Sequence, residues 1–330
     1  MRFSRLLFFS FTVFLFVFST AVCAQNPNQY LLVLNKADSN LVILNPSDLK
    51  ILGKVAVGDS PHEVVVSADG KTAFVANYGA QTPGSSLSVI DLASMKELRR
   101  VDLSPLLRPH GLQEIGGKIY FTAETNRLIA RYDPAANKVD FVMGTGQNGS
   151  HMIVGTSDQK RFYTANIGSD SVTAFEFQNV PPAGSRITHI AVGKQPEAID
   201  LSPDGKEVWV GLNAEGAIDI IDTTQNKTVG KIQLGGRPYR VKFTRDGKYV
   251  YATMLNAPEI IVIDAATRKE TKRIKLESTP LGIVFSKDGK WAFVSAVESD
   301  FVLKIDLEKG DVAAKVQTGK VPDGIALAGM

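Results

Sequence analysis

Short runs of apolar residues, separated by turn sequences, follow one another along the chain after residue 24. An apolar run such as Val64–Val66 is followed by the turn Ser67–Lys71, which contains Asp-Gly, and then by a second apolar run, Ala73–Ala76. Asp-Gly between two apolar runs is typical of a β-hairpin, because glycine accepts the positive φ that the turn needs. No long segment has the 3.6-residue period of a helix, so the pattern predicts an all-β protein.

The hairpin belongs to a repeat of about 43 residues. Each unit begins with a short tag, usually Pro and one variable residue, and the tags begin at Pro61, Pro109, Ser150, Pro196, Pro238, Pro280 and Pro322. After the hairpin, a third apolar run ends in Asp, as at Ile221-Asp222, and a fourth precedes the next tag. Four short antiparallel strands per unit are typical of a β-propeller blade.

The two ends of the chain predict the number of blades. Tyr30 to Val57 holds only three of the expected strands, whereas Val321 to Ala328 holds a tag and one strand. We therefore expect the C-terminal strand to complete the first blade and to close the ring, which leaves no free sheet edge. Six whole blades and this composite blade make a seven-bladed β-propeller. No linker interrupts the repeat, so residues 25–330 are predicted to form a single domain.

The N-terminal segment has the three-part pattern of a secretory signal peptide. Arg2 and Arg5 precede the apolar run Leu6–Phe18, and small residues follow up to Ala24. The run is shorter than the roughly 20 residues of a membrane-spanning helix. We predict cleavage before Gln25, a periplasmic or secreted product and no transmembrane span. Anchoring as a lipoprotein at Cys23 is the alternative, which the bulky Val22 disfavours.

Charge and composition exclude several classes of function. Lys and Arg number 37 against 34 Asp and Glu, a balance that does not favour nucleic acid as a partner. The single cysteine lies in the predicted leader, so the mature chain has no disulfide. Motifs for a serine triad, a phosphate-binding loop or covalent haem attachment are absent from the sequence. We expect a monomer.

The strand directions place each tag and the end of the second strand on the same face of the ring. Aligning the units on the turn glycine pairs His62 with Asn77, His110 with Glu124 and His151 with Asn166. One side of the channel mouth is thus predicted to be rich in imidazole, amide and carboxylate groups. Together with tag residues of other units, the candidate ligand-binding residues are His62, Asn77, His110, Glu124, His151, Asn166, Glu197, Tyr239, Arg240 and Asp323.

Three interpretations of these residues stay open. The imidazoles of His62, His110 and His151 would hold a divalent metal ion if they faced one point, and no other cofactor is indicated. Alternatively, His110 and Glu124 would serve as acid and base. In the third interpretation the residues are structural, and the two asparagines tie loops together. The fourth histidine, His189, falls on an outer strand and is expected to be structural or exposed.

The Pro tag, the Ser-x-Asp-Gly-Lys turn and the tetrapeptides Phe74–Asn77 and Tyr163–Asn166 resemble YVTN-type, YncE-like β-propeller repeats. The resemblance covers the whole mature chain. It implies a seven-bladed propeller, usually secreted or periplasmic, in a family that includes binding proteins and subunits of redox enzymes.

One unit also resembles the repeats of streptogramin lyase-like propellers, in Pro109–Leu112 and Tyr120–Glu124. In that family a channel His and a Glu 14 residues later serve catalysis, and His110 and Glu124 have this spacing. A second His expected three residues after the Glu is Arg127 here.

These observations lead to one expected function and two alternatives. We expect an exported propeller that binds a protein partner or small ligand at the channel mouth on the tag side, without catalysis. The first alternative is a metal-dependent or acid/base enzyme of lactonase or lyase type that uses His110 and Glu124. The second is an accessory subunit of a periplasmic redox system.

Overall fold

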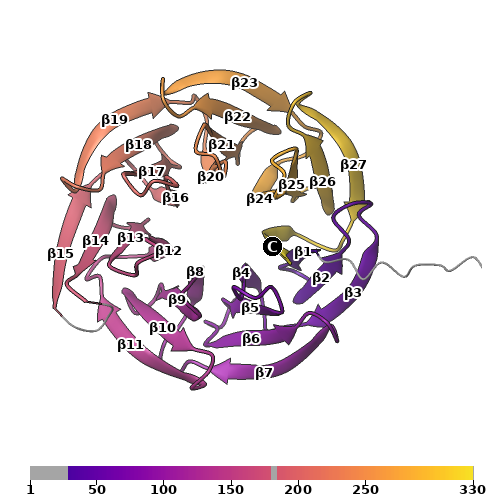
Figure 1. Ribbon diagram of the computed structural model, residues 1–330, viewed down its shortest axis with the longest axis horizontal. Helices are drawn as coiled ribbons and strands as arrows, with labels where there is room; N and C mark the ends of the chain where they lie inside the picture. Colours follow the sequence, from indigo (N-terminus) through magenta and orange to yellow (C-terminus); the bar gives the residue numbers. More distant parts are fainter. Residues whose placement is uncertain (1–28, 180–183, 330) are drawn as a thin grey trace, which may run out of the picture.

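The computed structural model describes residues 29–179 and 184–329, which form seven four-stranded antiparallel sheets around a central axis (Figure 1). The predicted seven-bladed β-propeller is confirmed. Within each blade the strands follow one another outward from the axis in chain order, except in the first blade. The predicted signal peptide, residues 1–24, and its cleavage site before Gln25 lie outside the described residues.

The strand boundaries repeat closely from blade to blade. Blade 1 consists of β28 (Pro322–Ala328), β1 (Tyr30–Asn35), β2 (Asn40–Leu44) and β3 (Ile51–Ala56). Blade 2 holds β4 (Pro61–Val66), β5 (Thr72–Asn77), β6 (Ser86–Asp91) and β7 (Lys96–Asp102). Blade 3 holds β8 (Pro109–Ile115), β9 (Lys118–Ala123), β10 (Leu128–Asp133) and β11 (Lys138–Gly144). Blade 4 holds β12 (Ser150–Gly155), β13 (Arg161–Asn166), β14 (Ser171–Phe177) and β15 (Ser185–Ala191).

The other three blades have the same order. Blade 5 holds β16 (Pro196–Leu201), β17 (Glu207–Leu212), β18 (Ala217–Asp222) and β19 (Lys227–Gln233). Blade 6 holds β20 (Pro238–Phe243), β21 (Tyr249–Met254), β22 (Glu259–Asp264) and β23 (Lys269–Lys275). Blade 7 holds β24 (Pro280–Phe285), β25 (Trp291–Ala296), β26 (Phe301–Asp306) and β27 (Asp311–Gln317).

The C-terminal strand closes the ring, as predicted. β28 pairs antiparallel with β1, with Tyr30 opposite Ala328 and Leu32 opposite Ala326. The innermost strand of blade 1 therefore comes from the end of the chain, whereas its other three strands come from the beginning. This pairing joins the two ends of the chain by backbone hydrogen bonds and completes the four strands of blade 1.

The hydrophobic core lies between neighbouring blades. Both faces of a middle strand are covered by adjacent sheets, so Ala73–Asn77 of β5 are all buried. One core cluster, for example, joins Leu32 and Leu34 of blade 1 to Val64 and Val75 of blade 2. The outermost strands face solvent on one side, which explains their charged sequences, as in Lys269–Lys275. Continuous apolar runs in the middle strands follow from this double burial.

Blade 3 departs from the predicted alignment. Its first hairpin turns through Gly116 and Gly117 alone, both at positive φ (61° and 77°), so this hairpin is shorter than the others. Pro109 consequently faces Ala123, whereas in blade 2 Pro61 faces Asn77. The predicted equivalence of Glu124 with Asn77 is therefore wrong by one residue. The alignment on the turn glycine allows for a turn one residue shorter in blade 3, whereas the structure makes it two residues shorter.

Candidate functional site at the tag-side channel mouth

The first residue after each second strand lies beside the tag of its own blade. The backbone N–H of Glu124 donates to the carbonyl of Arg108 at 3.0 Å, and Ile167 and Leu255 make the same bond to the residue before their own tags. This position, and not the last strand residue, places side chains at the mouth. Its occupants around the ring are Lys36, Tyr78, Glu124, Ile167, Asn213, Leu255 and Val297. The alignment on the turn glycine missed Lys36, Tyr78 and Asn213.

Three histidines from consecutive blades lie in contact at the mouth. Nδ1 of His62 is 3.0 Å from Nε2 of His110, so one ring donates a hydrogen bond to the other. The His110 ring lies against the His151 ring, with centroids 3.8 Å apart. Nδ1 of His151 in turn lies 3.1 Å from Oε2 of Glu124. The four side chains form one connected chain of polar groups from β4, β8, β12 and the loop after β9.

Tyr78 and Arg108 complete this cluster. The phenol ring stacks on the His62 ring at a centroid distance of 4.3 Å, and the Arg108 guanidinium carbon lies 4.6 Å from the phenol centroid. Nη1 and Nη2 of Arg108 donate to the carbonyls of Gly79 and Ala80, both at 3.1 Å. The guanidinium therefore fixes the loop that follows β5 to the tag of blade 3. Burial and the nearby Glu124 carboxylate raise the pKa of Tyr78 to about 12.

A second polar network crosses the channel. Arg240 of blade 6 forms an ion pair with Glu63 of blade 2, and its Nη2 lies 3.8 Å from Oδ1 of Asp323 in blade 1. The Tyr239 hydroxyl lies 3.1 and 3.2 Å from the two Asp323 oxygens, and Lys36 Nζ lies 3.2 Å from Oδ2. Blades 6 and 2 stand on opposite sides of the axis (Figure 1). The network therefore bridges the channel beside the histidines.

Blade 7 packs closely against blade 1 beside this bridge. At the corresponding tag it carries Leu281 and Gly282, and a Cβ on Gly282 would lie 2.3 Å from the carbonyl oxygen of Asp323. Any larger residue at position 282 would collide with the backbone of β28. Gly282 therefore allows the inner strands β24 and β28 to lie close together, as Gly324 does for β28 and β4.

The buried groups of the mouth have shifted pKa values. Burial lowers the pKa of His62 to about 3, against the opposing effect of Asp323, and burial also lowers the pKa of His110 well below its ordinary value. Both imidazoles are therefore neutral at pH 7. Burial raises the pKa of Glu63 and of Glu197. Burial acts in the same direction on Asp323, but Lys36 and Arg240 outweigh it and lower the pKa of this carboxyl.

One atom of the cluster has its hydrogen-bonding capacity unused. His110 is 1% exposed, and its Nδ1 has no hydrogen-bond partner among the described residues. Leaving a buried polar atom unsatisfied costs about 1–3 kcal/mol. The neighbouring imidazoles and Tyr78 are held by their own contacts, so this nitrogen is a fixed point at which a polar group would be stabilised.

The other predicted residues divide into two groups. Asn77 accepts from the Gly58 N–H and donates to Ser86 and Ser88, while Asn166 donates to Ser171 and Thr173. Both asparagines are buried and tie together their own blades. Glu197 lies at the mouth, where it accepts from Asn213, which itself accepts from Arg237. His189 is exposed on β15, with Nδ1 3.2 Å from the Thr173 hydroxyl.

The geometry bears on the metal and catalytic hypotheses. His62 and His110 direct ring nitrogens at each other, and no group of three or more His, Cys, Asp or Glu side chains in the described ranges has an arrangement that could hold a metal ion. The metal hypothesis stays a prediction. The hydrogen-bonded partner of Glu124 is His151 and that of His110 is His62. A carboxylate–imidazole pair is therefore present, but between residues other than the predicted two.

The fold and the repeat define a class, the β-propellers with a polar channel mouth. Within it, the chain belongs to the YncE-like β-propeller family, whose model matches residues 111–291 and 177–328. No curated protein matches the sequence. In the part of the chain that the structure describes, no helix is long and apolar enough to span a membrane.

Several solved structures share the fold. A functionally unknown protein from Desulfotomaculum acetoxidans is 14% identical, with 91% of this chain and 98% of that chain covered and a TM-score of 0.78. A chain of Kuenenia stuttgartiensis hydrazine synthase is 18% identical, with 88% and 99% covered and a TM-score of 0.72. Dihydro-heme d1 dehydrogenase NirN is 16% identical, with 89% and 64% covered and a TM-score of 0.66. Identities this low show the fold alone.

Proposed function

We propose that the protein is an exported β-propeller that binds a small polar ligand at the tag-side channel mouth, without catalysing a reaction. The observation that carries this proposal is the buried, unpartnered Nδ1 of His110 within a cluster of imidazole, phenol and carboxylate groups. Export is supported by the signal-peptide pattern of residues 1–24.

The rigidity of the mouth supports ligand binding. Arg108 fixes the loop that carries Tyr78, Tyr78 stacks on His62, and Glu124 orients His151. A site whose side chains are already ordered loses little conformational entropy when a ligand arrives. The Arg240–Glu63 bridge across the channel favours a ligand that enters and leaves from the tag side.

The four histidines provide the test. Ring ¹⁵N signals of His62, His110 and His151 report on the mouth, while His189 on the outer strand is an internal control. We expect members of a library of small carboxylates, amines and polyols to shift the three mouth signals and not that of His189. The same compounds should lose most of their affinity for His110→Phe and keep it for His189→Gln. The proposal fails if no compound shifts the mouth signals, or if His189 responds equally.

A second candidate function is acid/base catalysis, and one observation favours it. The Glu124 carboxylate lies 3.1 Å from Nδ1 of His151, which leaves Nε2 of the same ring for proton transfer. An assay of lactone and ester hydrolysis with Glu124→Gln, His151→Gln and His110→Ala separates the two functions. Turnover that requires Glu124 and His151 supports catalysis, whereas turnover unchanged in all three variants excludes these residues.

A further inference from the structure

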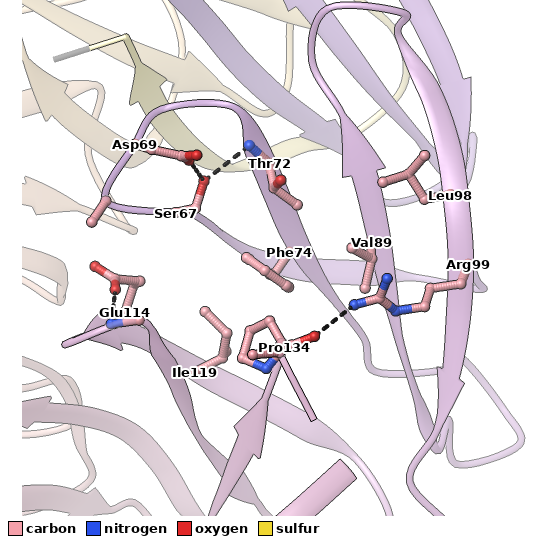
Figure 2. A pocket seen from close by; sticks show the side chains of 13 residues that line it. Ser67, Asp69, Thr72, Phe74, Val89, Leu98, Arg99, Glu114, Ile119 and Pro134 are labelled. Atoms are coloured by element: carbon pink, nitrogen blue, oxygen red, sulfur yellow. Dashed lines mark hydrogen bonds between the residues drawn. The ribbon is translucent and has the colours of Figure 1, made fainter. Parts of the chain in front are cut away.

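A groove between blades 2 and 3 opens on the face opposite the tags and has a volume of about 470 Å³. Figure 2 shows its walls, which come from the first hairpin turns of both blades, from the turn after β10 and from the outer strand β7. Binding pockets for small groups typically measure about 300–1,000 Å³, so the groove has room for two or three amino-acid side chains.

The floor of the groove is apolar and one wall is unusually exposed. Phe74, Val89 and Ile119 form the floor. Leu98 of β7 lies at the outer end and is 57% exposed, more than any other large hydrophobic residue in the described ranges. An exposed leucine beside an apolar floor is a surface that gains stability when a partner covers it.

The two ends of the groove carry opposite charges. Asp69 uses Oδ1 to accept from Ser67 and from the Lys71 N–H, and Glu114 uses Oε1 to accept from the Gly117 N–H. Each carboxylate thus keeps its second oxygen without a hydrogen-bond partner among the described residues. Figure 2 shows both carboxylates on one side of the apolar floor, with Arg99 on the other side.

Arg99 is fixed in place at the outer end. Its Nε and Nη2 donate to the Tyr132 hydroxyl at 3.2 and 3.0 Å, and Nη2 also donates to the Pro134 carbonyl at 3.2 Å. No described residue accepts from Nη1. The groove therefore presents an oriented donor at one end, two carboxylate oxygens at the other and an apolar surface between them.

Two other grooves on the same face show that this combination is not a general property of the fold. The groove between blades 4 and 5 has about 410 Å³ and contains Asp158, Asp200 and Asp204 together with Arg161. The groove between blades 6 and 7 has about 420 Å³, and there Arg245 and Lys287 lie among the acidic residues. Of these three grooves, only the first has an exposed leucine, and its arginine lies on the other side of the apolar floor from its two carboxylates.

We propose that the groove between blades 2 and 3 binds a short extended segment of a partner polypeptide that carries a basic residue beside an apolar one. The ammonium or guanidinium group of the segment pairs with Asp69 and Glu114, and the apolar side chain covers Phe74, Ile119 and Leu98. A backbone carbonyl of the segment accepts from Nη1 of Arg99. This site is separate from the tag-side mouth and does not depend on the function proposed there.

The test starts from a random heptapeptide library displayed on phage and panned against the whole protein. We expect the selected peptides to share Lys or Arg next to Leu, Ile or Phe. Synthetic copies should bind the variants Leu98→Glu and Glu114→Gln at least tenfold more weakly than the unsubstituted protein. Glu114→Gln keeps an oxygen that can accept from the Gly117 N–H, so it removes the charge and not the turn.

Matched controls complete the design. Val229→Glu introduces the same charge on β19, where Val229 is 43% exposed, and should leave binding unchanged. His110→Phe at the mouth should also leave it unchanged, which separates this proposal from the proposed function. The proposal is overturned if panning yields no binders, if the peptides lack the basic–apolar pair, or if Leu98→Glu binds them as tightly as the unsubstituted protein.

Discussion

Replacement of Arg240 by methionine removes the only cation that reaches both Glu63 and Asp323 among the described contacts of the channel bridge. The side chains of Arg240, Glu63 and Asp323 are 10%, 14% and 0% exposed. Breaking a buried ion pair by removing one partner typically costs about 3–5 kcal/mol, because it leaves an uncompensated buried charge. We expect Arg240→Met to lose about this much stability at pH 7.5, measured by chemical denaturation with tryptophan fluorescence.

The double variant Arg240→Met/Glu63→Met is the control for this explanation. It removes both charges, and Asp323 keeps Lys36 and the Tyr239 hydroxyl as partners. Replacing a whole buried pair by apolar residues is often nearly neutral, so the double variant should recover most of the lost stability. An equal loss in the single and double variants would refute the electrostatic argument, as would a loss below about 1 kcal/mol in the single variant.

The pH dependence provides a further check on the same variant. Burial already raises the pKa of Glu63 in the folded protein, and removal of Arg240 raises it further. A carboxyl whose folded pKa lies above its unfolded pKa destabilises the protein when it must ionise, and this penalty disappears as the pH falls through the folded pKa. The difference in stability between Arg240→Met and the unsubstituted protein should therefore shrink from pH 7.5 to pH 5.

Four further predictions concern closure, loops, protonation and metal. Deletion of residues 321–330 removes β28 and should sharply lower the Tm, so unchanged melting would contradict closure of the ring by this strand. Asn77→Ala leaves the buried Gly58 N–H without its acceptor and should cost about 1–3 kcal/mol in chemical denaturation, whereas Asn256→Ala at an exposed loop serves as a control for loop asparagines. Ring ¹⁵N shifts should show His62 neutral down to about pH 4, since its pKa is about 3. Because the unfolded chain takes up this proton near pH 6.5, the contribution of neutral His62 to the free energy of unfolding should fall as the pH drops from 6.5 towards 3. The metal hypothesis predicts nearly one divalent ion per chain after metal-supplemented purification, and elemental analysis showing less than about 0.1 would contradict it.

Part of the candidate site could be predicted from the sequence because it depends on the repeat. Tag residues occupy the same position in every blade, so the neighbouring tags at His62, His110 and His151 could be placed together from their spacing. Tyr78 was missed because the alignment took the last residue of the second strand as the mouth position. The turn of blade 3 carries the sequence signal that identifies the residue after the second strand as the mouth position. Its two glycines make that hairpin two residues shorter than the others, which places Glu124 after the strand and not at its end.

For Asn77 and Asn166, the sequence pattern does not show which way the side chain points. Their place in the tetrapeptide was visible, but whether an asparagine faces the channel or its own blade depends on the hydrogen-bond donors around it. Gly58 and Ser88 supply the partners of Asn77, and a local pattern does not show which of them its side chain contacts.

The amino-acid sequence alone determined the number of blades, the strands within each blade and the closure of the ring by the last strand. These features depend on local turns and on apolar runs that repeat at short range. Only the tertiary structure decided which groups meet across the ring. Arg240 and Glu63 lie 177 positions apart in the sequence. They belong to blades 6 and 2, which are not neighbours in the ring. Their ion pair lies beside Asp323 of blade 1, whose Oδ1 is 3.8 Å from Nη2 of Arg240. Such contacts depend on the closed geometry of all seven blades, and the groove that ends at Leu98 likewise exists only where two blades pack side by side.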